Sequence, residues 1–254
     1  MRSHVLLISL LGLLPAVALC DQAPAPPMGV WTGKGQLGFL GSQGNTDAQS
    51  LNAAFDAGLL SGLWQHTAHL DYLYGQSAHV VAAERWDAQW QSNYSFTPRM
   101  FAFGAAQYQH DMFSGFQYQA SETVGVGYKL INTAATKLDV QVGVGDQQLR
   151  PEDLIKNGTG AVIYRIPGPS LSSAIVSGGI NYSQVLTSTA TLTNKLLLQS
   201  GSANTLLTDA LALTVKMSTR LALSLGYNLQ NNSNPPAGLK KLDTTETVNL
   251  VFSF

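Results

Sequence analysis

Apolar and polar residues alternate along most of the chain from Trp31 onward. A period of two is the pattern of a β-strand whose two faces meet different surroundings. The clearest alternating runs begin at Leu51, Trp64, Glu84, Lys137 and Arg220. Turn residues separate these runs, and many of the apolar faces begin or end in Trp, Tyr or Phe, as membrane-spanning strands do at their aromatic girdles. The pattern predicts an all-β protein.

About twelve such strands can be counted. We expect them to start near residues 34, 48, 64, 84, 100, 117, 136, 171, 189, 204, 220 and 242. Crossing a bilayer takes roughly 10 tilted residues per strand, so twelve strands fit this length of chain, and an even number places both termini on one side. Connections are predicted to be short near 61–63, 97–99, 131–135, 188 and 217–219, and longer near 76–82, 112–116, 150–170 and 230–241. The predicted fold is an antiparallel up-and-down transmembrane β-barrel.

The last strand ends the chain on an aromatic residue. Its apolar face comprises Val248, Leu250, Phe252 and Phe254. A strand displays unpaired backbone groups along its edge, so this one needs a partner, which in a closed barrel is the first strand, near 34–41. A terminal Phe on an alternating strand also resembles the signal by which Gram-negative assembly machinery recognises outer-membrane barrels. A core strand that closes some other sheet is the alternative.

Composition separates the membrane barrel from a soluble one. Charged residues make up 11% of the chain and hydrophobic residues 45%, with 24 Gly and a formal net charge of −1. A soluble sandwich or secreted lipocalin-like barrel carries a charged exterior, typically about 25–35% charged. Here the face opposite the apolar one holds mainly Gln, Asn, Thr, Ser and Gly, which favours a lumen. The net charge gives no reason to expect a nucleic-acid partner.

The N-terminus has the features of an export signal. Arg2 and His4 precede an apolar run and then small residues up to Cys20, the single cysteine. The run is too short for a membrane-spanning helix, which needs about 20 apolar residues. We predict a signal peptide over 1–20, a Pro-rich linker over 21–30 and the barrel over 31–254. Acylation of Cys20 is a weaker alternative, because Leu19 is bulky where lipoproteins carry a small residue.

Several segments resemble one known family. They are WTGKGQLGFLGSQGNTDAQSL with its Gly44-Asn45-Thr46-Asp47 turn, Asp111-x-Phe113, Gly125-Val-Gly127-Tyr128 and the aromatic C-terminus. Their order is similar to that in the YdiY-like family of salt-induced outer-membrane proteins, a bacterial domain of unknown function. The resemblance spans roughly residues 31–254 and implies an outer-membrane barrel. It implies no activity, and the salt-stress label says nothing of mechanism.

Motifs for catalysis are largely missing. Gly33 to Gly38 matches GxGxxG, but a dinucleotide fingerprint must follow a buried strand and open a helix, whereas this one lies within an alternating strand. We therefore expect close-packed strand glycines, no enzyme activity, and no cofactor or metal. The alternative is an outer-membrane hydrolase with a rim site at His110 and Asp111, or at His79 and Glu84.

Charged residues on the polar faces are the remaining candidates. They are Asp56, His69, Asp71, Arg85, Asp87, Lys129, Asp139 and Lys216. Each would cost several kcal/mol in hydrocarbon, so we expect them to face the lumen, as a closing network or as the lining of a narrow water path. The predicted function is an outer-membrane structural component or a narrow small-solute channel. Expected partners are outer-membrane lipids, lipopolysaccharide and the β-barrel assembly machinery, and the protein is expected to be a monomer.

Overall fold

The computed structural model describes residues 29–42, 48–78, 80–158, 162–236 and 238–254. Within these ranges the chain forms thirteen β-strands, and it has no helix long and apolar enough to cross a membrane. The predicted signal peptide, most of the linker, the Gly44–Asp47 turn and His79 lie outside the described residues. The strands are β1 (Val30–Ser42), β2 (Ala48–Ser61), β3 (Trp64–Ser77), β4 (Val80–Ser95), β5 (Met100–Asp111), β6 (Phe116–Asn132), β7 (Thr136–Lys156), β8 (Val162–Pro167), β9 (Leu171–Val185), β10 (Ala190–Gly201), β11 (Thr205–Lys216), β12 (Leu221–Asn232) and β13 (Leu242–Ser253).

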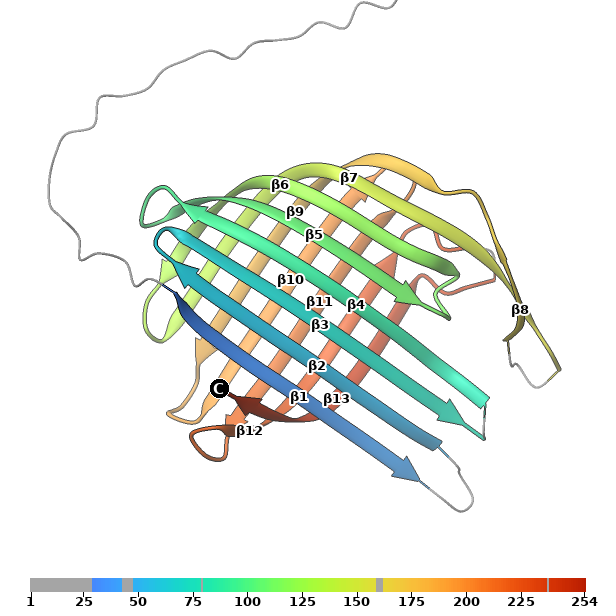
Figure 1. Cartoon of the computed structure of the whole chain (residues 1–254), viewed down its shortest axis with the longest axis horizontal. Coiled ribbons are helices and arrows are strands. Elements are labelled where there is room, and N and C mark those ends of the chain that lie inside the picture. The colour runs from blue at the N-terminus through green and yellow to red at the C-terminus, as the bar shows by residue number, and fades with distance from the viewer. Residues whose placement is uncertain (1–28, 43–47, 79, 159–161, 237) are drawn as a thin grey trace, which may run out of the picture.

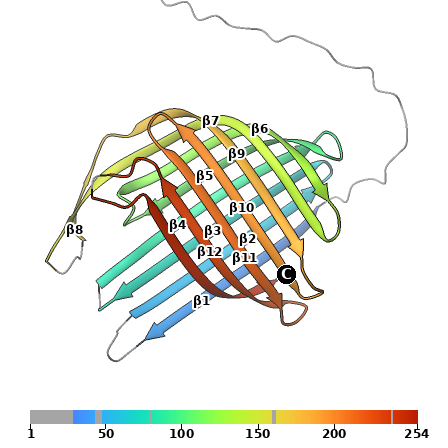
Figure 2. The same ribbon diagram turned by 180° about the vertical axis from the view of Figure 1, so that it is seen from behind.

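All the described strands except β8 close into one antiparallel barrel, which leaves twelve of the thirteen in the wall. Neighbours follow the chain from β1 to β7 and from β9 to β13, with β7 joined to β9 and β13 to β1. The strands cross the barrel at a tilt, and both ends of the chain's barrel segment lie at the same end of the barrel (Figure 1). The view from behind shows the wall formed by β9 to β13 (Figure 2). The predicted fold class and strand number are confirmed.

The seam of the barrel joins the first strand to the last. Lys34 to Leu37 pair with Ser253 to Leu250, within the segment where the partner of the last strand is predicted. Gly33 and Phe254 extend the seam by exchanging two backbone hydrogen bonds of 3.1 Å each. The last strand is therefore paired with the first over residues 250–254, and this pairing closes the sheet.

Alternation decides which side chains face outward. Leu37 of β1 pairs with Leu250 of β13, and Leu250 pairs with Leu223 of β12, so a continuous apolar band crosses the seam on the outside. Leu37 and Leu250 are 58% and 50% exposed. Gln36 and Val251, one position along, lie on the inner face, and Val251 is buried. The outer face is therefore apolar and exposed, while the inner face carries the buried polar side chains.

The connections differ between the two ends. At the end that carries the termini, tight turns link neighbouring strands, as predicted. At the opposite end, the predicted longer connection over 76–82 is wrong, because β3 reaches Ser77 and β4 starts at Val80, with Ala78 in the left-handed region. The predicted connection over 150–170 is also largely strand: β7 continues to Lys156 and pairs with β8 in a hairpin that projects beyond the barrel (Figure 1).

Two phenylalanines fill part of the inner wall. Phe101 and Phe103 of β5 face inward and are almost fully buried. A side chain at Gly127 would collide with the ring of Phe101, and one at Gly125 or Gly143 would meet that of Phe103. The glycines of β6 and β7 thus provide a flat surface on which the rings lie, which explains the glycine-rich strand next to the Phe-rich one.

Candidate functional site

Contacts that cross the barrel identify the inner face. Gln109 of β5 contacts Gln230 of β12, and Gln91 of β4 donates a 3.2 Å hydrogen bond to Gln141 of β7. Side chains two positions apart on a strand share a face, and so do residues paired directly across two strands. By this rule all eight predicted polar residues lie on the inner face. The pairs that establish this are Asp87 with Gln109, Asp71 with Asp87, Asp56 with His69, Lys129 with Asp139 and Lys216 with Ala222.

His69 forms an ion pair with Asp56 at 2.8 Å (Nδ1 to Oδ1). Gln36 donates a second hydrogen bond to the same carboxylate, at 3.3 Å. The nearer neighbour in sequence, Asp71, is not the partner of His69. Directly opposite positions on antiparallel strands bring Cβ atoms to about 4.5–5.5 Å, which explains why the cross-strand carboxylate takes the imidazole.

Asp71 and Asp87 lie opposite one another on β3 and β4. Arg85 sits 3.7 Å from Asp71 (Nη2 to Oδ1), Asn52 donates to Asp71 at 3.3 Å, and Gln89 donates to Asp87 at 3.0 Å. Two like charges facing each other are unfavourable in a sheet, so these donors offset the repulsion. Asp87 is buried, and the pair stands immediately beside Gln109.

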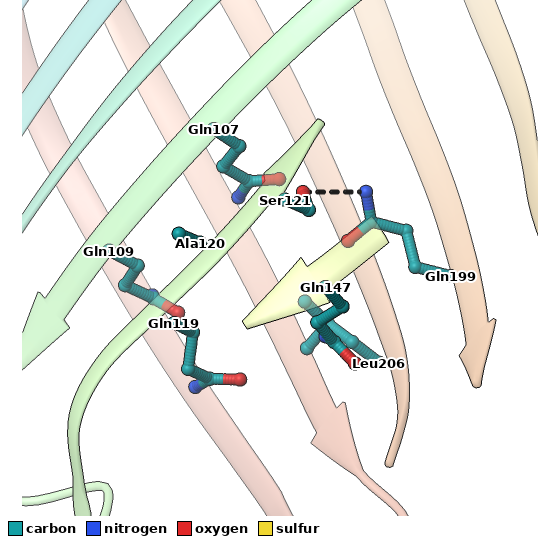
Figure 3. A pocket seen from close by; sticks show the side chains of 8 residues that line it. All are labelled: Gln107, Gln109, Gln119, Ala120, Ser121, Gln147, Gln199 and Leu206. Carbon is teal, nitrogen blue, oxygen red and sulfur yellow. Dashed lines mark hydrogen bonds between the residues drawn. The ribbon is translucent and has the colours of Figure 1, made fainter. Parts of the chain in front are cut away.

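A layer of glutamines fills the lumen at this level. The layer consists of Gln107, Gln109, Gln119, Gln147, Gln199 and Gln230. Gln109 and Gln230 exchange two amide hydrogen bonds, at 3.0 and 3.1 Å, across the lumen. Gln199 donates to Ser121 at 3.0 Å, and the side chains converge from several strands (Figure 3). The cavity left among them measures about 10 Å³, about the space of one water molecule.

Two members of the layer have polar atoms without a protein partner. Both amide atoms of Gln119 and the Oε1 atom of Gln147 are buried and unpaired, and these side chains are 5% and 2% exposed. Buried amides are usually satisfied, so the one-water cavity beside them is a natural place for their hydrogen bonds. The layer is not among the site residues predicted from the sequence, although every member lies on the polar face of its strand.

At the end of the barrel opposite the termini, here called the mouth, connections between different strands contact one another. A side chain at Gly115, between β5 and β6, would collide with Leu239 and Pro236 of the connection between β12 and β13. Gly115 also accepts a 2.7 Å backbone hydrogen bond from Glu152 of β7. Arg165 of β8 pairs with the buried Glu152 at 2.7 Å and donates to the carbonyl oxygen of Met112. The projecting hairpin is therefore tied to the mouth.

Of the rim residues considered for catalysis, His110 and Asp111 do not assemble into a site. His110 and Asp111 are consecutive in β5 and point to opposite faces. The His110 ring contacts the carbonyl oxygen of Gln117 at 2.5 Å and lies near Trp86 on the outside, whereas Asp111 accepts a hydrogen bond from the backbone of Phe113. Among the described residues, no group of three His, Cys, Asp or Glu side chains could hold a metal ion.

Together these features define a small single-chain up-and-down β-barrel with an apolar outside and a polar, partly filled inside. The chain belongs to the family described as "Protein of unknown function, DUF481", whose model matches residues 35–254. It is 24% identical over 236 residues to the "Uncharacterized protein YdiY" of Escherichia coli (strain K12), a match that covers 91% of this chain and 86% of the relative. The predicted family resemblance is confirmed.

Solved barrels resemble the chain more distantly. The translocator domain of the autotransporter NalP from Neisseria meningitidis is 13% identical, with a TM-score of 0.45 and coverage of 92% of this chain and 89% of that one. The NanC porin is 11% identical, with a TM-score of 0.47 and coverage of 89% and 99%. Each is a likeness to another barrel at low sequence identity.

Proposed function

We propose that this protein is an integral outer-membrane β-barrel whose lumen is closed at rest by the glutamine layer. The membrane part of the proposal is supported by the outer face. Val124, Val142, Val176 and Val248 are each about 60% exposed there. Burying an apolar side chain of this kind is worth about 1.5–3 kcal/mol, so a band of them is stable in lipid and unfavourable in water.

The charge distribution supports the same placement. The outward positions of the barrel strands carry few charged residues, and the inner face carries most of them. A secreted soluble barrel would need the reverse arrangement. Cell fractionation with heat-modifiable gel mobility tests this part: we expect a folded, heat-modifiable band in the outer-membrane fraction, and recovery from the soluble periplasm would contradict it.

The observation that carries the closed state is the reciprocal pair between Gln109 and Gln230. It spans the lumen from β5 to β12, and both side chains are buried. The pocket among the neighbouring glutamines has room for about one water, which supports a lumen that is blocked to hydrated solutes at this level. The protein then acts as a non-conducting envelope component, without enzymatic activity.

A narrow channel that opens transiently is the second candidate. The observation that favours it is the weakness of the closure: a neutral hydrogen bond contributes only about 0.5–1.5 kcal/mol net. Breaking two of them costs about 1–3 kcal/mol, which is compatible with a minor open population of about 1–10%. A lumen that is wet and charged beyond the layer, as at the exposed Lys195, is consistent with such openings.

Recording in planar bilayers tests the closure directly. We expect wild type to be silent or to open rarely, and the Gln109→Ala/Gln230→Ala variant to conduct in discrete steps. Gln65→Ala is the matched control, because Gln65 is an exposed inner-face glutamine outside the layer. Steady conductance of wild type, or silence of the double variant once folding is verified by gel mobility, would contradict the closed-by-glutamine mechanism.

A further inference from the structure

The lumen on the terminus side of the glutamine layer is rich in lysine. Lys34 lies near the start of β1, Lys129 near the end of β6 and Lys216 at the end of β11, all toward the end of the barrel that carries the termini. Lys195 lies midway along β10. Asp56 lies opposite Lys34 and Asp139 lies opposite Lys129 on the inner face. Positive charge is in excess in this part of the lumen.

The two carboxylates are already engaged by other groups. Asp56 binds His69 at 2.8 Å and also accepts a hydrogen bond from Gln36. Asp139 accepts a 2.8 Å hydrogen bond from Asn181. Their oxygens are thus satisfied without any lysine, and no counter-charge is left in contact with the ammonium groups.

Three of the lysines have no partner among the described residues. Lys34, Lys195 and Lys216 form no ion pair and no side-chain hydrogen bond there, and all three are exposed. Lys195 stands on β10, which lies nearly opposite β2 and β3 in the closed strand order, so it faces the same part of the lumen as Asp56 and His69. The three ammonium groups therefore line one part of the lumen from different sides, without a counter-charge in contact among the described residues.

The rim at the same end is also basic. Arg99 and Arg220 lie in the turns at this end, and Lys137 is the second residue of β7, directly after the turn from β6. The turn residues 62–63, 96–99, 133–135, 186–189 and 218–220 contain no Asp or Glu. Positive charge at a low-dielectric entrance attracts anions and raises their local concentration.

We propose that the lumen on the terminus side of the glutamine layer, with Lys34 and Lys195 on its walls and Lys216 at its entrance, is a binding site for small anions bearing phosphate or carboxylate groups. Lysine binds such groups as a mobile point charge, and rings of basic side chains give lumens an anion preference. The inference rests on the proposed closure in one respect: the glutamine layer forms the inner boundary of this part of the lumen. Anions enter from the end of the barrel that carries the termini.

The test uses the full-length barrel in non-ionic detergent at low salt, with inorganic phosphate as the probe in a calorimetric titration. We expect saturable binding to wild type that weakens about tenfold or more in Lys34→Gln/Lys195→Gln, because two ammonium charges are lost. Lys240→Gln/Lys241→Gln, in the connection between β12 and β13 at the other end, is the matched control and should bind as wild type.

Gel mobility verifies that each variant is folded before titration. Absence of binding to wild type, or equal binding by the lumenal and control variants, would overturn the anion site. The bilayer recordings separate this outcome from the closure. If wild type conducts but binds phosphate through Lys34 and Lys195, the closed-barrel proposal fails and the anion site stands. If wild type is silent and does not bind phosphate, only the anion site is refuted.

Discussion

The ring of Phe254 occupies the space beside Gly33 that a side chain at position 33 would fill. The two residues also exchange both of their backbone hydrogen bonds, at 3.1 Å. Phe254 stacks further on Phe55 of β2, with 6.3 Å between ring centroids. The end of the chain is thereby fixed on the outside of the seam by backbone pairing and by ring packing together.

Gly33→Ala should destabilise the barrel, because the new methyl group meets the Phe254 ring and forces it to move. Overpacking of this kind costs about 1–3 kcal/mol. Urea unfolding followed by Trp fluorescence measures the change. Gly35→Ala is the matched control, since Gly35 lies on the same face of β1 with nothing within 4 Å of the added carbon, and it should unfold as wild type. Equal destabilisation by both substitutions would contradict the packing argument.

Deletion of Phe254 should impair assembly more than it impairs the finished barrel. The folded seam loses two backbone hydrogen bonds and the ring contacts with Phe55 and Phe252, whereas the predicted assembly signal loses its terminal aromatic residue. We expect outer-membrane levels in cells to fall several-fold. The refolded protein should keep a heat-modifiable band, with stability lowered by about 1–3 kcal/mol. Unchanged levels in the outer membrane would refute the assembly signal and leave the strand pairing intact.

Gly125→Ala should be more harmful than the seam substitution. The added carbon would meet the backbone of Val142 and Gly143 as well as the Phe103 ring, and backbone cannot rotate away. We expect a loss of about 3 kcal/mol, or failure to refold into micelles. Gly104→Ala, on the adjacent strand with open space around the new carbon, is the control. Refolding yield and urea midpoint are the measurements, and a normal midpoint for Gly125→Ala would show that β6 and β7 can separate.

Arg165→Ala should loosen the β7–β8 hairpin from the mouth of the barrel. It leaves the buried Glu152 carboxylate without its partner at 2.7 Å. Removing one member of a buried pair costs about 3–5 kcal/mol, but Arg165 is partly exposed, so about 1–2 kcal/mol is expected. Chymotrypsin cleavage after the exposed Tyr164 should therefore accelerate about tenfold.

Glu152→Gln/Arg165→Met keeps the side-chain volumes while removing the unpaired charge, and it should return cleavage toward the wild-type rate. Lys240→Ala, an exposed residue with no ion pair among the described residues, is the control for loss of a surface charge at this end. Cleavage at the wild-type rate in Arg165→Ala would mean that the pair does not hold the hairpin.

The barrel wall is largely predictable because each strand carries its own signal. Alternation alone places the starts of β2, β3, β5, β7, β9 and β13 at the observed residues. The alternation pattern does not predict β8, because this strand has only six residues, VIYRIP, with adjacent apolar positions and a terminal Pro. It exists because the end of β7 offers an edge, which is a tertiary cause that no local pattern contains.

The partners inside the lumen are much harder to predict. Gln109 and Gln230 are 121 residues apart, and they meet because the tilt of the strands brings them to one level on opposite walls. Alternation specifies the face of a residue and leaves its height in the barrel open. The same limit applies to His69, whose partner Asp56 is supplied by the pairing register of β2 with β3.

The closure described above consists of amide groups that carry no net charge. Moving one elementary charge through a 100 mV potential is worth about 2.3 kcal/mol, but displacing Gln109 and Gln230 transfers no such charge. An electrical potential across the membrane therefore performs almost no work on this barrier. A voltage ramp should leave the open fraction unchanged, whether the barrel stays closed or opens rarely by thermal motion.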